Sequence, residues 1–336
     1  MAEHHVVTIG TFDAAHLGHA ALVRRAREIA DARGARVAVL AFDPHPSAVL
    51  APERVPARLT RFEDRAQLLS TFGADVVERL SPTPELLATE PRDFIEGIVQ
   101  RLAPVAFVEG ADFRFGRRRG GDLELLTELG SELGFSVERF EPVFASLTDQ
   151  TVTRASSTMV RWLLGHGRVR DAEALLGRRY AIDGTVARGH RRGRTIGVPT
   201  ANLTLGEDAP LIPAEGVYAA KAELPGGREL AAAVSIGTNP TFDGGVRTIE
   251  AHVLDVERYG DTIAGLPEYG WPLRLSFVGR IRDQIRFGRV DELSAQLHRD
   301  IERARATLAN GGFVPEAFID DPAHPGSEQH AEHTHL

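Results

Sequence analysis

The stretch Gly10-Thr11-Phe12-Asp13-Ala14-Ala15-His16-Leu17-Gly18-His19 follows a short apolar run, Val6–Ile9, and leads directly into a segment of helical period. A strand that turns through glycines into a helix gathers unpaired backbone N–H groups and the positive end of the helix dipole at the turn. The glycines let the backbone approach a phosphate, and the imidazoles of His16 and His19 can donate hydrogen bonds to its oxygens. The stretch therefore predicts a phosphate site; the alternative is that both histidines only cap the helix.

The rest of the first half repeats this pattern of short β-branched runs alternating with helical segments. The runs are Val6–Ile9, Val37–Phe42, Val76–Leu80 and Val105–Val108. Their nearly continuous apolar character is typical of parallel strands that are covered on both faces by helices. We therefore predict a Rossmann-like α/β/α domain whose ligand site lies at the carboxyl ends of the strands.

After Gly177 the sequence changes to strand-like runs separated by turn residues. These runs are Ile182–Ala187, Val217–Leu224, Glu229–Ile236, Arg247–Leu254 and Leu273–Val278. Pro225-Gly226-Gly227 reads as a hairpin turn, so this half is expected to form an antiparallel β-barrel. An amphipathic segment, residues 290–308, predicts a helix lying on that barrel. We expect domains at residues 1–178 and 179–310, followed by a disordered His-containing tail at 311–336.

Composition limits the kinds of chemistry. The chain has 336 residues, enough for two domains, and no cysteine, which excludes thiolate nucleophiles, disulfides, thiolate zinc sites and iron–sulfur clusters. Its formal net charge of -8 gives no overall attraction to nucleic acid or anionic membranes, so the clusters Arg117–Arg119 and Arg191–Arg194 are interpreted as local phosphate-facing patches. No window approaches ~20 consecutive apolar residues, and Met1–His5 lack the charged segment and following apolar region of a signal peptide, so we expect none. We expect a cytoplasmic protein, a monomer or weak homo-oligomer, whose partners are small molecules and neither nucleic acid nor membrane.

Four motifs in the first half resemble, in order, those of bacterial FAD synthetases of the nucleotidyltransferase superfamily. They are Gly10–His19, Phe42–Pro46, Gly110–Gly116 and Ser156–Arg161. The resemblance implies a domain that joins FMN to the AMP moiety of ATP. It further implies catalytic roles for His16 and His19, nucleotide contacts for Gly10, Phe12, Asp13, Gly18, Ser157, Thr158 and Arg161, and flavin contacts for Asp112, Phe113 and Phe115.

The chemistry of some of these side chains also suggests a role without the family resemblance. The pair Phe113 and Phe115 can wall a flat ring, although residues two apart in a strand can equally share a core face. Arg161 can meet phosphate oxygens with its fork of donors or form a surface ion pair. Ala14 stands where the family usually has glycine; if this position needs a positive φ, the methyl group costs ~1 kcal/mol or more.

A second glycine-containing segment precedes the barrel strands. Gly184–Gly189 and Gly193–Asn202 lack the lysine and the following helix of a Walker A loop. Backbone amides between Gly189 and Gly197 could wrap phosphates, and the Thr200 hydroxyl and Asn202 carbonyl are hard oxygen donors that suit Mg²⁺.

This segment resembles the signature of riboflavin kinases. The resemblance implies a Greek-key barrel that phosphorylates riboflavin, with Glu250 as the general base. It also implies nucleotide contacts at Gly189, Gly193, Arg194 and Gly197, magnesium contacts at Thr200 and Asn202, and a flavin contact at Arg282. Gln284 stands where the family usually has glutamate, and His252 could be structural.

The leading hypothesis is a bifunctional enzyme that uses magnesium and ATP twice, first to convert riboflavin to FMN and then to convert FMN to FAD with release of pyrophosphate. One alternative is a riboflavin kinase whose N-terminal domain is inactive or takes another substrate. A second alternative is a flavin or nucleotide sensor without catalysis. The joint presence of His16, His19 and Glu250 argues against the sensor, since a binding protein needs no general base.

Overall fold

The computed structural model describes residues 3–189, 197–238, 247–260, 262–309 and 317–319 of the chain. Contacts divide the chain into two compact units. The first comprises Met1–Ser146, Val152–Ser157 and Glu316–Leu336, and the second comprises Leu147–Thr151 and Thr158–Pro315. This grouping assigns residues 158–178 to the second unit, although the sequence pattern predicts that they belong to the first domain. The domain boundary stays a prediction.

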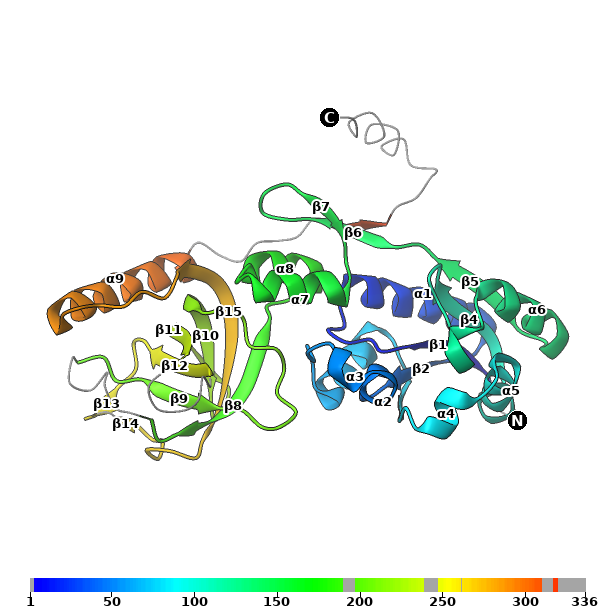
Figure 1. Cartoon of the computed structure of the whole chain (residues 1–336), viewed down its shortest axis with the longest axis horizontal. Helices are drawn as coiled ribbons and strands as arrows, with labels where there is room; N and C mark the ends of the chain where they lie inside the picture. Colours follow the sequence, from blue (N-terminus) through cyan, green and yellow to red (C-terminus); the bar gives the residue numbers. More distant parts are fainter. Residues whose placement is uncertain (1–2, 190–196, 239–246, 261, 310–316, 320–336) are drawn as a thin grey trace. The chain divides into compact units, whose positions relative to one another are not determined.

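A five-stranded parallel sheet forms the centre of the first unit (Figure 1). Its order is β3-β2-β1-β4-β5, with β1 His5–Gly10, β2 Arg36–Phe42, β3 Val76–Leu80, β4 Pro104–Gly110 and β5 Ser136–Phe140. The four strands predicted from the sequence are confirmed. The fifth strand, Ser-Val-Glu-Arg-Phe, was not predicted. It lies at a sheet edge and is partly exposed, so its sequence is too polar to form an apolar run.

Helices cover both faces of this sheet. Helices α1 Leu17–Arg33 and α3 Phe62–Phe72 contribute buried residues to the core cluster on one face. Helices α5 Pro91–Leu102 and α6 Leu123–Leu133 contribute to the cluster on the other face. Short elements complete the layers: α2 Ser47–Leu50, η1 Pro52–Arg54, α4 Pro84–Ala88 and η2 Arg117–Arg119. Burial on both faces is the physical reason why the central strands are almost entirely apolar.

A small antiparallel sheet of order β16-β6-β7 also belongs to the first unit. Its strands are β6 Val143–Ser146, β7 Val152–Arg154 and β16 Ala317–Ile319. Residues 317–319, which lie within the tail predicted to be disordered, form β16 by pairing with β6, whose backbone groups offer this extended segment a partner. Disorder of the tail stays a prediction. The remainder of the tail, including its four histidines, lies outside the described residues.

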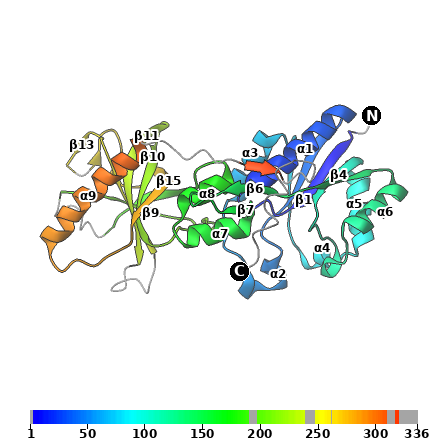
Figure 2. The same cartoon turned by 90° about the horizontal axis from the view of Figure 1, so that it is seen from above.

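The second unit contains a closed six-stranded antiparallel barrel, drawn from a second direction in Figure 2. Two helices, α7 Ser157–Gly165 and α8 Val169–Leu176, precede it in the chain. The barrel order is β10-β11-β12-β9-β8-β15, with β8 Ala181–Ala187, β9 Ala201–Thr204, β10 Gly216–Leu224, β11 Arg228–Thr238, β12 Arg247–Val253 and β15 Pro272–Arg282. Because β9 lies beside β12 while β10, β11 and β12 follow one another, the topology is the predicted Greek key.

The outer face of the barrel carries the predicted C-terminal helix, α9 Val290–Ala309. Ala304 of this helix is fully buried in a cluster that includes Ala219 of β10 and Leu254. Two further short strands, β13 Arg258–Tyr259 and β14 Thr262–Ile263, pair with each other. The hairpin predicted at residues 225–227 is confirmed: Gly226 and Gly227 have φ values of 87° and 78°, which glycine adopts without a steric cost.

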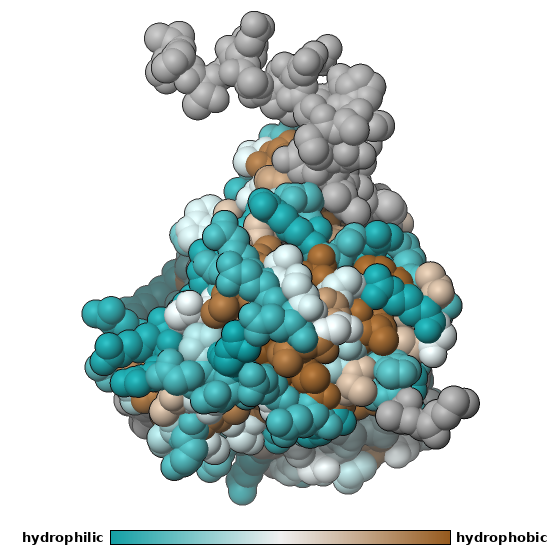
Figure 3. All heavy atoms as spheres, turned by 90° about the vertical axis from the view of Figure 1, so that its right-hand side faces the viewer, coloured by the Kyte–Doolittle hydropathy of each residue, from teal (hydrophilic) through white to brown (hydrophobic). Residues whose placement is uncertain are grey.

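None of the helices in the described residues could span a membrane, because none combines the length and the apolar character needed to cross a bilayer. The face drawn in Figure 3 is mainly hydrophilic, with hydrophobic side chains in small groups between the polar ones. Such a mixture is common on the surfaces of folded proteins.

Candidate active sites

The turn between β1 and α1 brings two imidazoles together at a helix N-terminus. The rings of His16 and His19 stack with centroids 3.6 Å apart and an interplanar angle of 21°. His16 is the N-cap residue of α1, but its side chain makes no capping hydrogen bond. Helix capping therefore does not explain why a histidine occurs at this position. A Cβ atom at Gly18 would lie 3.1 Å from the His16 ring, which explains why a glycine occurs there. The turn therefore presents the charge pattern that an anion requires.

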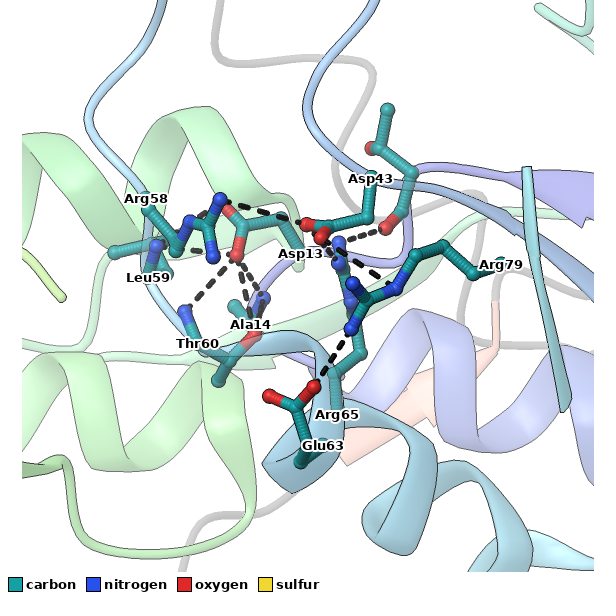
Figure 4. A network of polar contacts seen from close by, with 10 residues as sticks. Asp13, Ala14, Asp43, Arg58, Leu59, Thr60, Glu63, Arg65 and Arg79 are labelled. Atoms are coloured by element: carbon teal, nitrogen blue, oxygen red, sulfur yellow. Dashed lines mark hydrogen bonds and ion pairs between the residues drawn. The ribbon is translucent and has the colours of Figure 1, made fainter. Parts of the chain in front are cut away.

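Asp13 fixes the shape of this turn. Its Oδ1 and Oδ2 accept the Leu59 N–H at 3.1 and 3.0 Å, and Oδ1 also accepts the N–H and hydroxyl of Thr60 at 3.0 and 3.1 Å (Figure 4). The N–H of Ala14 donates to the same Oδ1 at 3.0 Å. The carboxylate is 5% exposed. Its oxygens are thus occupied by the protein, and a contact between Asp13 and a nucleotide phosphate, as the sequence suggested, would also bring like charges together.

A buried ion pair supports the turn from the other side. Arg65 of α3 is 3% exposed and donates to the Asp43 carboxylate at 2.7 Å and to the Thr11 carbonyl at 2.5 Å (Figure 4). Burial lowers the pKa of Arg65, while the charges of Asp13 and Asp43 act in the opposite direction. The two carboxylates therefore offset the free-energy cost of burying the charged guanidinium of Arg65.

Replacing Asp43 with alanine should destabilise the first unit by about 3 kcal/mol, because it leaves the buried Arg65 guanidinium without its nearest anion. Urea unfolding of the full chain followed by circular dichroism measures the effect. Asp64→Ala is the matched control, since that carboxylate forms only a partly exposed pair with Arg61. Equal unfolding midpoints for both variants would contradict the assigned role of the buried pair.

Two cavities of the first unit open around the end of β1. One of about 240 Å³ is lined by the α1 turn, including Phe12, His16 and His19, and by the segment that contains Ser156. The other, of about 860 Å³, extends over Pro46, Leu50 and the arginines of η2. Both cavities are lined by Ile9, Gly10, Asp112 and Phe113. A group held in one cavity can therefore reach a group held in the other at these shared residues.

The aromatic pair in the larger cavity lies in the loop after β4. The rings of Phe113 and Phe115 stack with centroids 5.4 Å apart and an interplanar angle of 22°. Phe115 is 5% exposed and packs in the core near Phe94, whereas Phe113 is only partly buried. Both alternatives from the sequence are thus represented: Phe115 contributes to the core, and Phe113 offers ring surface to the cavity. The Asp112 carboxylate pairs with Arg154 at 3.1 Å.

The predicted residues of the fourth motif begin helix α7. The Ser157 hydroxyl donates to the Asp13 carbonyl at 2.6 Å, which connects the start of this helix to the phosphate turn. Thr158 and Arg161 follow on the same helix. Their contacts with a nucleotide stay a prediction.

In the second unit, three polar residues lie side by side across three barrel strands. Asn202 of β9 is the register partner of Glu250 of β12, and Glu250 is the register partner of Ser235 of β11. The alternate residues of β12, such as Ile249 and Ala251, are buried, so this row is on the outer face. Directly opposed residues have Cβ atoms only about 5 Å apart, so a metal ligand at Asn202 would be close to the predicted base.

The segment before β9 is held close to these residues. A Cβ atom at Gly189 would lie 2.2 Å from Cγ of Asn202, so a larger residue at this position would require the Asn202 side chain to move. The His252 ring contacts the Pro199 carbonyl through Nδ1 at 2.7 Å, and burial lowers its pKa. A cavity of about 60 Å³ is lined by Gly189, Thr200 and Asn202 among others. Gly197 has a φ of 74°, while Gly193 and Arg194 lie outside the described residues.

The predicted flavin contact Arg282 is held by an acid on α9. Its Nε and Nη2 donate to the Asp300 carboxylate at 3.0 and 2.7 Å. Gln284 donates through Nε2 to the Ser235 hydroxyl at 2.7 Å and to the Ile236 carbonyl at 3.1 Å. An ionised glutamate could not donate to that carbonyl, so the hydrogen bond that joins this segment to Ile236 of β11 requires the amide of Gln284.

Sequence reasoning missed several residues that shape these sites: Thr60, Arg65, Glu109, Ser235 and Asp300. Each acts through a partner distant in the sequence, and local patterns carry no signal for such a pairing. The one exception is Glu109, a charged residue that directly follows an apolar strand run.

The chain is similar to known proteins along most of its length. A family model described as FAD synthetase matches residues 1–158, and one described as riboflavin kinase matches residues 176–308. The bifunctional riboflavin kinase/FMN adenylyltransferase of Listeria monocytogenes is 35% identical over 306 residues, which covers 90% of this chain and 92% of the relative. The protein of the same name from Escherichia coli is 36% identical over 301 residues, covering 89% and 91%. A crystal structure described as a macrolide-efflux protein from Streptococcus pneumoniae has a TM-score of 0.80 and 29% identity, covering 91% of this chain and 95% of the other.

Proposed function

This chain belongs to the family of bifunctional riboflavin kinases/FMN adenylyltransferases, and we propose that its first unit holds the adenylylation site and its barrel the kinase site. The enzyme phosphorylates riboflavin to FMN and adenylylates FMN to FAD, with ATP as the second substrate of each step. The kinase-only and sensor alternatives are not favoured, since the relatives match both halves of the chain.

For adenylylation, ATP occupies the smaller cavity of the first unit and FMN the larger one. The observation that supports this assignment is that both cavities are lined by Ile9, Gly10, Asp112 and Phe113. At this junction an oxygen of the FMN phosphate attacks the α-phosphorus of ATP. The new P–O bond forms FAD as the bond to pyrophosphate breaks. The apolar ring of Phe113 suits the flavin.

The chain's own groups supply the electrostatic part of this reaction. His16 and His19 lie at the N-terminus of α1, where their N–H groups and the helix dipole stabilise the charge that develops on the phosphate oxygens. Gly10, Phe12 and Gly18 complete the phosphate turn, and Ser157, Thr158 and Arg161 are assigned to the triphosphate. Asp13 contributes by holding the turn in shape, since its carboxylate is occupied by Leu59 and Thr60.

For phosphorylation, magnesium-ATP binds against the Gly189–Asn202 segment. The donors present fit Mg²⁺, because the Thr200 hydroxyl and Asn202 carbonyl are hard oxygens and this ion takes its remaining ligands from phosphates and water. When bound, magnesium neutralises negative charge on the transferred phosphoryl group. Gly189, Gly193, Arg194 and Gly197 are assigned to the phosphates, and the flavin lies toward Arg282.

Glu250 acts as the general base of the kinase. Its position opposite Asn202 places a carboxylate beside the metal ligand, where it can take the proton of the riboflavin 5′-hydroxyl as that oxygen attacks the γ-phosphorus. The bond between the γ-phosphorus and the β-phosphate oxygen breaks at the same time, and ADP is released. Asp300 holds Arg282 by two hydrogen bonds and so fixes the guanidinium at the edge of this site.

We propose that the enzyme works in the cytoplasm as a monomer or weak homo-oligomer. A formal net charge of -8 does not attract a polyanion, which supports small molecules as its partners in place of nucleic acid.

Incubation of the pure protein with magnesium-ATP and either riboflavin or FMN, followed by separation of the flavins, tests the proposal. Riboflavin should yield FMN and then FAD, and supplied FMN should yield FAD. FMN as the sole product would mean that the first unit does not adenylylate FMN, and no product from either flavin would contradict both assignments.

The replacement Ala14→Gly should change the rate of FAD formation by less than about fivefold. Ala14 already has a left-handed φ of 73°, a conformation that glycine, the residue implied here by the family resemblance, adopts readily. Its N–H is held by Asp13 and by the Thr60 hydroxyl, at 3.0 and 3.2 Å. Steady-state adenylylation of FMN by both proteins measures this. If FAD formed only with the glycine variant, Ala14 would be the cause of a lost adenylylation activity, and the wild-type chain would be a riboflavin kinase only.

A further inference from the structure

A buried carboxyl group lies between the two central strands of the first unit, at the edge that faces the cavities. The backbone pairing of β1 with β4 ends at Val7 and Phe107. Two residues later, the N–H of Ile9 donates to Oε1 of Glu109 at 2.6 Å. A side chain thus takes the place of the neighbouring strand's carbonyl. Glu109 is 2% exposed, so this hydrogen bond is shielded from water.

The place of this contact in the sheet gives it a functional meaning. In the order β3-β2-β1-β4-β5, the chain turns from one side of the sheet to the other between β1 and β4. Open parallel sheets bind ligands in the crevice at such a switch point. Glu109 lines the smaller cavity together with Thr8, Ile9 and Gly110. The carboxyl therefore stands where the strands separate to form that cavity.

The surroundings of Glu109 disfavour its charged form. Burial raises the pKa of Glu109 well above its ordinary value, and the hydrogen bond from the Ile9 N–H acts in the opposite direction. A neutral carboxylic acid can accept the Ile9 N–H through one oxygen and donate a hydrogen bond through the other. An ionised carboxylate in the same place would repel the triphosphate of ATP.

We propose that Glu109 is a positioning residue of the adenylylation site, whose carboxyl group holds the Ile9 N–H and keeps β1 and β4 apart where ATP binds. The inference rests on the proposed location of ATP in the smaller cavity. It assigns to Glu109 an effect on ATP affinity through the width of the crevice.

Three full-length variants test the proposal. Glu109→Val removes the acceptor and lets the strands approach, so KM for ATP in the adenylylation of FMN should rise about tenfold or more with a smaller effect on kcat. Glu109→Gln keeps a neutral acceptor for the Ile9 N–H and should restore most of this loss. Glu128→Gln, the same change at an exposed position of α6, is the control. Riboflavin kinase activity should be equal in all of them.

The pH dependence provides the readout that a merely structural residue would not change. The other ionisable groups that line the cavity are His16, His19, Asp112, Glu141 and Arg154. Because Glu109→Gln removes one ionisable group and leaves all of these others in place, comparing the two pH profiles isolates Glu109. A rise of KM for ATP with pH that is present in the wild type and absent in Glu109→Gln would report ionisation of Glu109.

Two outcomes would overturn the inference. One is a wild-type KM for ATP in folded Glu109→Val, with folding checked by circular dichroism. The other is the same alkaline profile in the wild type and in Glu109→Gln. Failure of the proposed function looks different, because the wild type itself would then form no FAD from FMN.

Discussion

The replacement Glu250→Gln should lower the turnover of riboflavin phosphorylation by ~10²–10⁴-fold, the usual contribution of a general base. The amide has nearly the same shape as the carboxylate but cannot take the proton of the attacking hydroxyl. Because Glu250 is flanked in register by Asn202 and Ser235, the strand pairing that positions it should persist. KM for ATP should therefore change little.

The measurement is steady-state FMN formation from riboflavin, with the adenylylation of supplied FMN as an internal control in the same protein. Glu223→Gln, on an exposed position of barrel strand β10, is the matched control and should retain full kinase activity. Wild-type turnover in Glu250→Gln would mean that the base is another residue. Loss of both activities in a folded protein would contradict independent sites.

The second large effect is expected at the phosphate turn. The replacement His19→Ala should lower FAD formation from FMN by about 10²–10³-fold, the range found when one donor is removed from a site that stabilises developing charge. His19 stacks on His16 at the start of α1, so its removal also frees the remaining imidazole to change position. Riboflavin phosphorylation should be unaffected.

Single-turnover adenylylation with saturating magnesium-ATP distinguishes a slower chemical step from weaker binding. His4→Ala is the control, since His4 is exposed near the opposite end of β1. His19→Asn, which keeps an N–H donor, should lie between the wild type and the alanine variant. If His19→Ala formed FAD at the rate of the control, the role of this imidazole would be disproved.

The sequence was most informative where local pattern and tertiary structure agree. The apolar runs at Val6–Ile9 and Val37–Phe42 became central strands because both of their faces are covered. Strand β9 was not predicted, since Ala201–Thr204 is only four residues long and its polar members suggested the end of a loop. Its assignment depends on β8 and β12, which lie on either side of it in the barrel.

The same limit applies to the sites. Motif spacing alone predicted that His16 and His19 would lie together, because residues three apart at a helix start share a face. It could not show that Asp13 would be occupied by Leu59 and Thr60, since that contact spans more than forty positions and depends on how the segment before α3 folds back. The family resemblance implied nucleotide contacts for all of these residues. In the fold, Gly10, Phe12 and Gly18 line the cavity, whereas Asp13 accepts hydrogen bonds from Leu59 and Thr60 and holds the turn together.

The register row of Asn202, Glu250 and Ser235 has a consequence for how this barrel can vary. Side chains of a strand alternate between its two faces, so removing a single residue from β12 ahead of Glu250 would turn the carboxylate into the apolar interior and bring Ile249 or Ala251 outward. Loop insertions leave the pairing of β9, β12 and β11 unaltered. Changes of length in the connections should therefore be tolerated over evolutionary time, whereas the spacing within these three strands is fixed by the reaction as firmly as the identity of the base.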